Sequence, residues 1–452
     1  MSMTAIDKYV EDHIDNSIAE LSKLCEFPSV AAQNQNMDEC AEFVEQLLKK
    51  RGFTTEIMPT GGSPVVYGYR KGKIDKTLIF YDHYDVQPAE PFELWDTPPF
   101  EPALRDGKLF ARGVSDNKGN ITSRLFAIDA ILEEDGELPC NVKFIIEGEE
   151  EIGSVHLPKF VEENAEKLAG DACIWEFGGV NHEDIPEQVL GLRGICYVEL
   201  SVETADIDVH SGTGGTIFPN AAWRLVWALN TLKDTNERVR IPGFYDNVVP
   251  PTDRDKEILS ALPDVAEDYK TRYGVKEFLK GTTGGIDLHI QEVFEPSCTI
   301  CGLTSGYQGP GSKTVLPAKA SAKIDFRLVP DQSPEEILEK LRSHLDAEGF
   351  SDVLIEDLGG GSPGRTDPDD PFVEVVVQSA VDVYESPQIV RPLVGGSGPN
   401  HAFLKYIKVP ICTAGVGYPG SRAHAPNENI RLDLYLKATK HIVRILKAFA
   451  ES

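Results

Sequence analysis

The stretch Thr77-Leu-Ile-Phe-Tyr-Asp-His-Tyr-Asp85 is an apolar run that ends in a histidine, and an aspartate follows two residues later. Such runs are typical of buried parallel strands, and open α/β sheets bind ligands at the carboxyl ends of their strands. His83 could bind a metal there through one ring nitrogen while Asp85 accepts a hydrogen bond from the other. The pair alone also fits a strand that ends in a surface histidine, so the metal hypothesis depends on other segments.

Apolar segments on both sides of this run predict an α/β layer. We expect strands and helices to alternate along the chain: strands at 64–70, 77–82, 142–147 and 172–175, and helices at 5–24, 37–51, 117–134 and 156–167. This alternation favours a mostly parallel sheet.

The sequence pattern changes near residue 190. Cys196–Glu203 and residues 319–329 alternate between apolar and polar side chains, as half-exposed antiparallel strands do. Ser333–Glu348 begins with Ser-Pro-Glu-Glu, which favours a helix N-terminus. The α/β character returns after a glycine-rich linker near residue 360. We therefore predict an α/β domain with an α+β domain inserted into it: 1–189 and 363–452 form the first, and 190–362 the second.

Composition and charge exclude several functions. The 452 residues carry a net charge of −29, and nucleic-acid partners are not expected because phosphate binding needs a basic face. No apolar run reaches the roughly 18 residues that span a bilayer, so no membrane partner is expected either. The N-terminal segment lacks the basic and apolar parts of a signal peptide, which predicts a cytoplasmic protein.

Four further segments place polar residues at predicted strand ends or in loops. They contribute Asp116 before a helix, Glu150 and Glu151 after the strand 142–147, Glu176 after the strand 172–175, and His424 in a late loop. Each has a plain structural alternative, such as a helix N-cap for Asp116 or a solvated surface for the acidic run. If Glu150 is left aside, these residues and His83 together supply two imidazoles and three carboxylates. If Asp116 bridges, each of two metals receives one histidine, one further carboxylate and a position for water.

The motifs that contain these residues resemble a known family. In order they are His-x-Asp, Arg-Gly-x-x-Asp-x-Lys-Gly, Glu-Gly-x-Glu-Glu-x-Gly-Ser and Ala-His-x-x-Asn-Glu. This order resembles the di-zinc family of metallopeptidases that includes aminoacylases, carboxypeptidases and carnosine or cytosolic non-specific dipeptidases. Gly191–Tyr197, Asp208–Gly212 and Phe326–Pro330 resemble the cytosolic dipeptidase branch in particular.

The resemblance implies a role for each residue of the first domain's site. His83 and Glu176 would hold one metal, Glu151 and His424 the other, and Asp116 would bridge them. Asp85 would orient His83, Glu150 would be the general base, and the Asp116–Asn117 peptide would be cis. The two ions would be divalent, with zinc as the first expectation and manganese or cobalt as alternatives.

The resemblance also implies roles for the inserted domain. Residues 190–362 would form a lid and dimerisation domain, so the protein would be a homodimer. His210 would reach the partner subunit's active site and stabilise the oxyanion. Arg327 would bind the substrate's C-terminal carboxylate. Gly396 and Ser397 would add donors at the pocket wall.

The resulting hypothesis is a metal-dependent exopeptidase. It would hydrolyse the amide bond of dipeptides or short peptides with a free C-terminal carboxylate, through a metal-bridging water and Glu150. One alternative is an N-acyl amino acid deacylase or desuccinylase, because Glu176 stands where dipeptidases of the family have Asp. Pro363–Pro371 also lacks a histidine found in the dipeptidase branch. A remote alternative is a non-catalytic, metal-dependent binding protein.

Overall fold

The computed structural model describes residues 3–452, and the chain divides into two compact units. Unit 1 contains the chain up to Gly191, Arg365–Pro392 and Pro399–Ser452, whereas unit 2 contains Leu192–Gly364 and Leu393–Gly398. The chain passes from one unit to the other at β10 (Gly191–Leu192) and at β17 (Gly364–Arg365), and it crosses twice more at the ends of the segment Leu393–Gly398.

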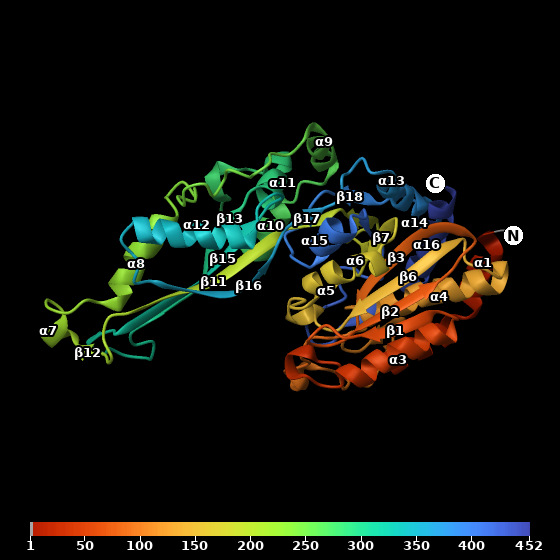
Figure 1. Cartoon of the computed structure of the whole chain (residues 1–452), viewed down its shortest axis with the longest axis horizontal. Coiled ribbons are helices and arrows are strands. Elements are labelled where there is room, and N and C mark those ends of the chain that lie inside the picture. Colours follow the sequence, from red (N-terminus) through yellow and green to blue (C-terminus); the bar gives the residue numbers. More distant parts are fainter. Residues whose placement is uncertain (1–2) are drawn as a thin grey trace. The chain divides into compact units, whose positions relative to one another are not determined.

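Unit 1 is built on a six-stranded sheet in the order β1-β2-β6-β3-β7-β19 (Figure 1). β6, β3, β7 and β19 are parallel, whereas β1 and β2 pair antiparallel at one edge. The strands are β1 (Thr54–Met58), β2 (Val65–Arg70), β3 (Ile74–His83), β6 (Cys140–Glu147), β7 (Ala172–Trp175) and β19 (Ile411–Thr413). The last six residues of β3 are all buried, which explains the apolar run Leu78–Tyr81 that predicted the strand.

Helices cover both faces of this sheet. One face packs on the larger apolar core with α1 (Met3–Asp12), α2 (Ile14–Cys25), α3 (Met37–Lys50), α4 (Lys118–Asp135), α13 (Pro371–Ser379) and α16 (Leu432–Glu451). The other face packs on a smaller core with α5 (Leu157–Glu163), α6 (Ala165–Leu168) and the π-helical turn η5 (Phe403–Ile407). Two short helices complete the set, α14 (Val381–Tyr384) and α15 (Asn400–Ala402). A sheet covered on both faces explains why its central strands have no polar side.

The two longest helices of unit 1 illustrate how sequence sets burial. α16 buries Leu434, Ala438, Ile442, Ile445 and Phe449, which recur at helical spacing on one face. α4 is buried nearly all round and ends at Gly136, whose positive φ of 81° suits a glycine C-cap. Because α4 begins directly after Asp116 and Asn117, it fixes the position of that predicted site segment.

Short elements surround the main sheet. Two small sheets have the orders β20-β5-β4 and β18-β9-β8. Their strands are β4 (Ala103–Arg105), β5 (Lys108–Phe110), β8 (Gly179–Val180), β9 (Pro186–Val189), β18 (Ile389–Arg391) and β20 (Asn429–Arg431). Single helical turns lie at η1 (Ala31–Gln33), η2 (Phe92–Leu94) and η3 (Glu150–Ile152).

Unit 2 contains a four-stranded antiparallel sheet in the order β13-β15-β11-β16. Its strands are β11 (Gly194–Glu203), β13 (Ser297–Ser305), β15 (Lys319–Leu328) and β16 (Leu354–Gly361). β11 and β15 alternate strictly in burial, and α8 (Ala221–Leu232) and α12 (Pro334–Ala347) pack on their apolar side. The remaining elements are β12 (Val209–His210), α7 (Ser211–Gly214), α9 (Asp253–Ala261), α10 (Ala266–Tyr273), η4 (Leu279–Gly281), α11 (Gly285–Phe294) and β14 (Val315–Leu316).

The predicted fold class is confirmed: one unit has a mostly parallel sheet between helices, and the other is α+β with an antiparallel sheet. One detail differs from the sequence pattern. The helix predicted over 5–24 is interrupted at His13, and the C-terminal part of the α/β unit has two short helices, α13 and α14, that meet at Ala380. Among the described residues, no helix is both long and apolar enough to cross a membrane.

Candidate active site

The carboxyl ends of three neighbouring parallel strands collect the predicted residues in unit 1. His83 is the last residue of β3, Glu147 ends β6 just before Glu150 and Glu151, and Glu176 follows β7 directly. β6, β3 and β7 are adjacent, and His83 lies opposite Glu147 in the register. The topology therefore brings these side chains to one edge of the sheet, where α/β proteins bind their ligands.

Asp116 lies at the centre of the cluster. Its Oδ1 is 3.1 Å from His83 Nε2, and its Oδ2 is 3.1 Å from His424 Nε2. Nε2 of His424 is also 3.1 Å from Glu151 Oε2. Ligand atoms of His83, Asp116 and Glu151 all lie within 4.8 Å of one another, so they could share metal ions.

The segment that carries Asp116 owes its path to close backbone packing. A Cβ atom on Gly119 would lie 2.2 Å from the Val114 carbonyl oxygen, so only glycine fits there. The Asp116–Asn117 peptide is cis, as the resemblance implied. Asn117 donates from Nδ2 to the Glu176 carbonyl oxygen at 2.7 Å, which joins this segment to the end of β7.

Asp85 supports both His83 and the acidic turn. His83 Nδ1 is 3.1 Å from the Asp85 carbonyl oxygen and 3.3 Å from its Oδ1. The Asp85 carboxylate also accepts the backbone N–H groups of Glu150 and Glu151, at 3.3 and 2.9 Å. One buried aspartate thus holds the histidine ring, leaves Nε2 facing Asp116, and fixes the start of η3.

The cluster shifts the pKa values of its members. Burial, reinforced by the nearby Asp116 and Glu151 carboxylates, raises the pKa of Glu150 to about 7. Burial and the charge of Glu150 raise the pKa of Glu176 well above its usual range. Burial opposes protonation of His83, but hydrogen bonds to Asp116 and Asp85 outweigh it and raise the pKa of the ring. Such shifts are typical of sites where charged groups converge.

The donor set fits divalent cations. Two imidazoles and three carboxylates are the ligand types that zinc accepts, and oxygen-rich sets also suit manganese or cobalt. Glu176 accepts a hydrogen bond from Trp175 Nε1 on Oε1 at 3.0 Å, while its buried Oε2 has no hydrogen-bond partner in the described part of the chain. A bound cation would satisfy this oxygen and reduce repulsion among the carboxylates.

Glu428 is an important residue whose role was not predicted from the sequence. Its fully buried carboxylate accepts the backbone N–H groups of Gly113, Ser115 and Asp116 at 2.9, 2.9 and 3.0 Å. It also pairs with Arg112 Nη1 at 2.7 Å. Glu428 therefore ties the turn that carries Asp116 to the loop that carries His424. The sequence signal was its place as the last residue of the Ala-His-x-x-Asn-Glu motif that contains His424.

The remaining predicted residues lie in unit 2. Arg327 donates from Nη1 to Ser397 Oγ at 3.0 Å and from Nε to Asp325 Oδ2 at 3.0 Å. The carbonyl oxygen of Gly396 accepts the Arg193 N–H at 2.9 Å. The structure thus brings Arg327 and Ser397 into contact, and Gly396 bonds to the backbone between β10 and β11.

His210 has a defined hydrogen-bond geometry on β12. Its Nδ1 accepts the Gly212 N–H at 3.0 Å, and its Nε2 is 3.3 Å from Thr314 Oγ1. An Nδ1 that accepts leaves the proton of a neutral imidazole on Nε2. The exposed side chain of His210 is therefore held with Nε2–H available as a donor.

Comparison with known proteins assigns the family. Residues 79–448 match peptidase family M20/M25/M40. The chain belongs to this family. It is 30% identical to Beta-Ala-His dipeptidase of Homo sapiens over 80% of this chain and 73% of that protein. It is 29% identical to Cys-Gly metallodipeptidase dug1 of Schizosaccharomyces pombe over 97% of both chains.

A solved structure supports the same assignment. The M20 family metallo-carboxypeptidase Sso-CP2 from Sulfolobus solfataricus has a TM-score of 0.90 and 36% sequence identity to this chain. The match covers 96% of this chain and 99% of that one. The resemblance inferred from the motifs is confirmed, and so is the predicted enzyme class, a hydrolase of the metallopeptidase kind. The family assignment therefore disfavours the non-catalytic alternative.

Proposed function

We propose that this chain is a two-metal exopeptidase that hydrolyses dipeptides or short peptides with a free C-terminal carboxylate. The observation that carries the proposal is the convergence of His83, Asp116, Glu151 and His424, with Glu150 beside them. The dipeptidase and carboxypeptidase relatives support the substrate class.

Five side chains would hold two divalent ions. His83 and Glu176 would bind one ion, Glu151 and His424 the other, and Asp116 would contribute one oxygen to each. Bound cations of this kind polarise an amide carbonyl and lower the pKa of water. Asp85 would keep His83 in the required tautomer, and zinc is the first expectation for the metal.

Glu150 would be the general base. Its carboxylate has no hydrogen-bond partner among the described residues, whereas the neighbouring Glu149 is bound to Ser63 and His156. Glu150 would take a proton from the attacking water and return it to the leaving amine. Its backbone N–H is held by Asp85, which keeps the side chain beside the cluster.

Residues of unit 2 would recognise the substrate. Arg327 would bind the C-terminal carboxylate, because a guanidinium offers a planar set of donors that matches a carboxylate. Ser397 already contacts that guanidinium, and Gly396 would line the same wall. His210 would stabilise the oxyanion from the partner subunit, and its Nε2–H provides the donor that this role requires.

An exposed apolar face supports the proposed homodimer. α8 leaves Trp223, Val226 and Trp227 on its outer side, with exposed fractions of 57, 40 and 55%. The two indole rings stack with centroids 5.9 Å apart, and Ile217 and Phe218 precede them in the chain. Exposed apolar patches of this kind mark protein interfaces, so we place the dimer contact on unit 2.

The decisive experiment is a substrate panel. Metal-loaded protein would be incubated with a mixture of dipeptides and N-acyl amino acids, and the loss of each would be followed by mass spectrometry. We expect loss of dipeptides, and none in an EDTA-treated sample or in Glu150→Gln. Loss in the EDTA-treated sample would overturn the metal assignment.

Glu176 favours one second candidate, an N-acyl amino acid deacylase or desuccinylase. Carboxypeptidase and deacylase members of the family resemble this chain in having Glu at this position. Loss of acylated amino acids alone from the same panel would establish the second candidate and reject the first.

A further inference from the structure

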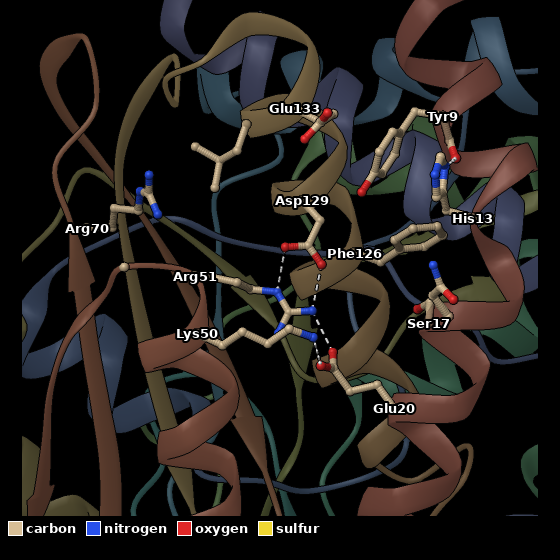
Figure 2. Close-up of a pocket in the computed structure, with 13 residues that line it drawn as sticks. Tyr9, His13, Ser17, Glu20, Lys50, Arg51, Arg70, Phe126, Asp129 and Glu133 are labelled. Carbon is tan, nitrogen blue, oxygen red and sulfur yellow. Dashed lines mark hydrogen bonds and ion pairs between the residues drawn. The ribbon is translucent and has the colours of Figure 1, made fainter.

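A pocket of about 570 Å³ lies in unit 1. Figure 2 draws the residues that line it, and the candidate metal ligands are not among them. Its wall is formed by α1, α2, the C-terminal end of α3, the end of β2 and the second half of α4. None of its thirteen lining residues is a candidate metal ligand or base. The volume lies in the range of about 300–1,000 Å³ that small-molecule sites occupy.

A closed ion network forms the centre of the pocket. Arg51 is only 6% exposed and donates to both carboxylate oxygens of Asp129, at 2.8 and 2.6 Å. It also donates to Glu20 at 2.5 Å, and Lys50 pairs with the other Glu20 oxygen at 2.9 Å. These two acids are therefore already neutralised by their cations.

Arg70 is the cation that this network leaves without a carboxylate. Its half-buried guanidinium lies over Gly52, where Nη1 would be 2.8 Å from an added Cβ atom. Within residues 3–452 it has no hydrogen bond or ion pair. Figure 2 shows Arg70 on the far side of the Arg51 network from Tyr9.

Glu133 is an exposed anion at the edge of the pocket that has no ion-pair partner among the described residues. It lies one turn after Asp129 on α4. Tyr9 lines the same pocket, and burial together with the charges of Asp129 and Glu133 raises the pKa of its hydroxyl. The Tyr9 ring stacks on His13 at 4.1 Å and lies 6.3 Å from the Phe126 ring. Aromatic faces of this kind attract ammonium groups.

We propose that this pocket binds a small zwitterion, a molecule with one carboxylate and one ammonium group. Arg70 would bind the carboxylate. Glu133 would bind the ammonium beside the Tyr9 ring and hydroxyl. Free amino acids and short peptides both have this chemistry, and they differ in the distance between their two charges. The proposal does not depend on the proposed peptidase activity.

The test uses ω-amino acids of increasing length on the full-length, metal-loaded protein. Calorimetric titration with glycine, β-alanine, 4-aminobutanoate and 6-aminohexanoate should show saturable binding of at least one member. Tightest binding of the short members would identify α-amino acids as the ligand class, and tightest binding of the longest would identify short peptides. Either pattern supports the proposal, whereas no saturable binding of any member overturns it.

Matched variants locate the binding. Arg70→Gln and Glu133→Gln should each weaken the best zwitterion at least about tenfold, because each removes a charge-assisted hydrogen bond. Lys71→Gln and Glu134→Gln change the net charge equally outside the pocket and should leave binding unchanged. Equal binding in all four variants would place the ligand elsewhere, at the metal cluster for instance, and would overturn the proposal.

Ligands with a single charge provide a test that needs no variant. Butanoate lacks the ammonium and butylamine lacks the carboxylate of 4-aminobutanoate. If both charges are recognised, each should bind the unaltered protein at least about tenfold more weakly than the best zwitterion. Equal binding of either would contradict a two-point site.

Discussion

At the scale of single residues, two neighbouring carboxylates have different environments. Glu150 faces the ligand cluster without a hydrogen-bond partner among the described residues, whereas Glu149 accepts from the Ser63 N–H and contacts His156 Nδ1 at 3.1 and 2.7 Å. We expect Glu150→Gln to lower kcat by at least about a hundredfold, because it removes general base catalysis. Glu149→Gln is the matched control and should remain within a few fold of the unaltered enzyme.

The metal content of the variant distinguishes a general base from a metal ligand at position 150. Glu150→Gln should retain the same number of metal ions per subunit, measured by inductively coupled plasma mass spectrometry on dialysed protein. A variant that loses both activity and metal would mean that Glu150 is a ligand, and the general base would have to be sought elsewhere.

A second residue-scale prediction concerns Glu428. Its carboxylate holds three backbone N–H groups of the Asp116 turn and the buried Arg112 guanidinium. Glu428→Gln would leave Arg112 without its charge partner, which costs about 3–5 kcal/mol for a buried pair. We also expect about 10–100-fold weaker metal binding, as for other residues that orient ligands.

Competition with a fluorescent chelator would measure that affinity. Asp433→Asn is a suitable control, because Asp433 forms an exposed ion pair with Arg431 on the same C-terminal segment. Unchanged metal affinity in Glu428→Gln, with a folded protein, would show that the Asp116 turn is held by other contacts.

At the scale of elements, the sequence predicted those strands and helices whose apolar residues recur at regular spacing along the chain. The apolar run before His83 and the alternation in β11 and β15 correspond to the burial of these strands. The parallel or antiparallel character of the strands, and the sheet edge that carries His83, could therefore be predicted. The Glu428 contacts were not, because they join residues more than 300 positions apart and leave no periodic signal. The pocket around Arg51 was missed for the same reason: α1, α2, α3 and α4 each contribute only a few of its residues.

The end of β6 allows a prediction about pH. Glu147 is buried and contacts the Tyr81 hydroxyl and Ser154 Oγ, and burial raises its pKa to about 8. A carboxyl group with a raised folded-state pKa stabilises the fold at low pH, and this stability is lost as the pH rises from about 4.5 through 8. Glu147→Gln keeps an acceptor oxygen but cannot ionise.

Thermal unfolding at several pH values would check this. The Tm of Glu147→Gln relative to the unaltered protein should increase from pH 5 to pH 9, both being measured after EDTA treatment. Parallel Tm curves over that range would mean that Glu147 does not ionise with the expected pKa.

The outer face of α8 carries a prediction about assembly. Trp223→Ala combined with Trp227→Ala removes the stacked indoles, so we expect the dimer to dissociate in sedimentation velocity experiments. Tyr273→Ala on α10 is the control, since Tyr273 is 62% exposed on a different helix of the same unit. A stable dimer in the double variant would place the subunit contact on another face.

At the scale of the whole molecule, the proposed function assigns roles to residues of both units, and the proposed dimer would let each subunit supply part of its partner's site. His210→Ala and Glu150→Gln should each be inactive alone. Mixing them in equal amounts, with subunit exchange, gives half hybrid dimers. Each hybrid has one site with both changes and one with neither, so about a quarter of the unaltered activity should return.

One observation and one control make this experiment decisive. His210 keeps Nε2–H as a donor through its contact with Gly212, so His210→Ala removes a donor and leaves the metal ligands of unit 1 in place. Subunit exchange can be verified with differently tagged copies before activity is measured. If exchange is complete and no activity returns, His210 acts within its own subunit. Recovery near a quarter would instead fix both the dimer and the shared site, because a site formed within one chain cannot be repaired by mixing two inactive variants.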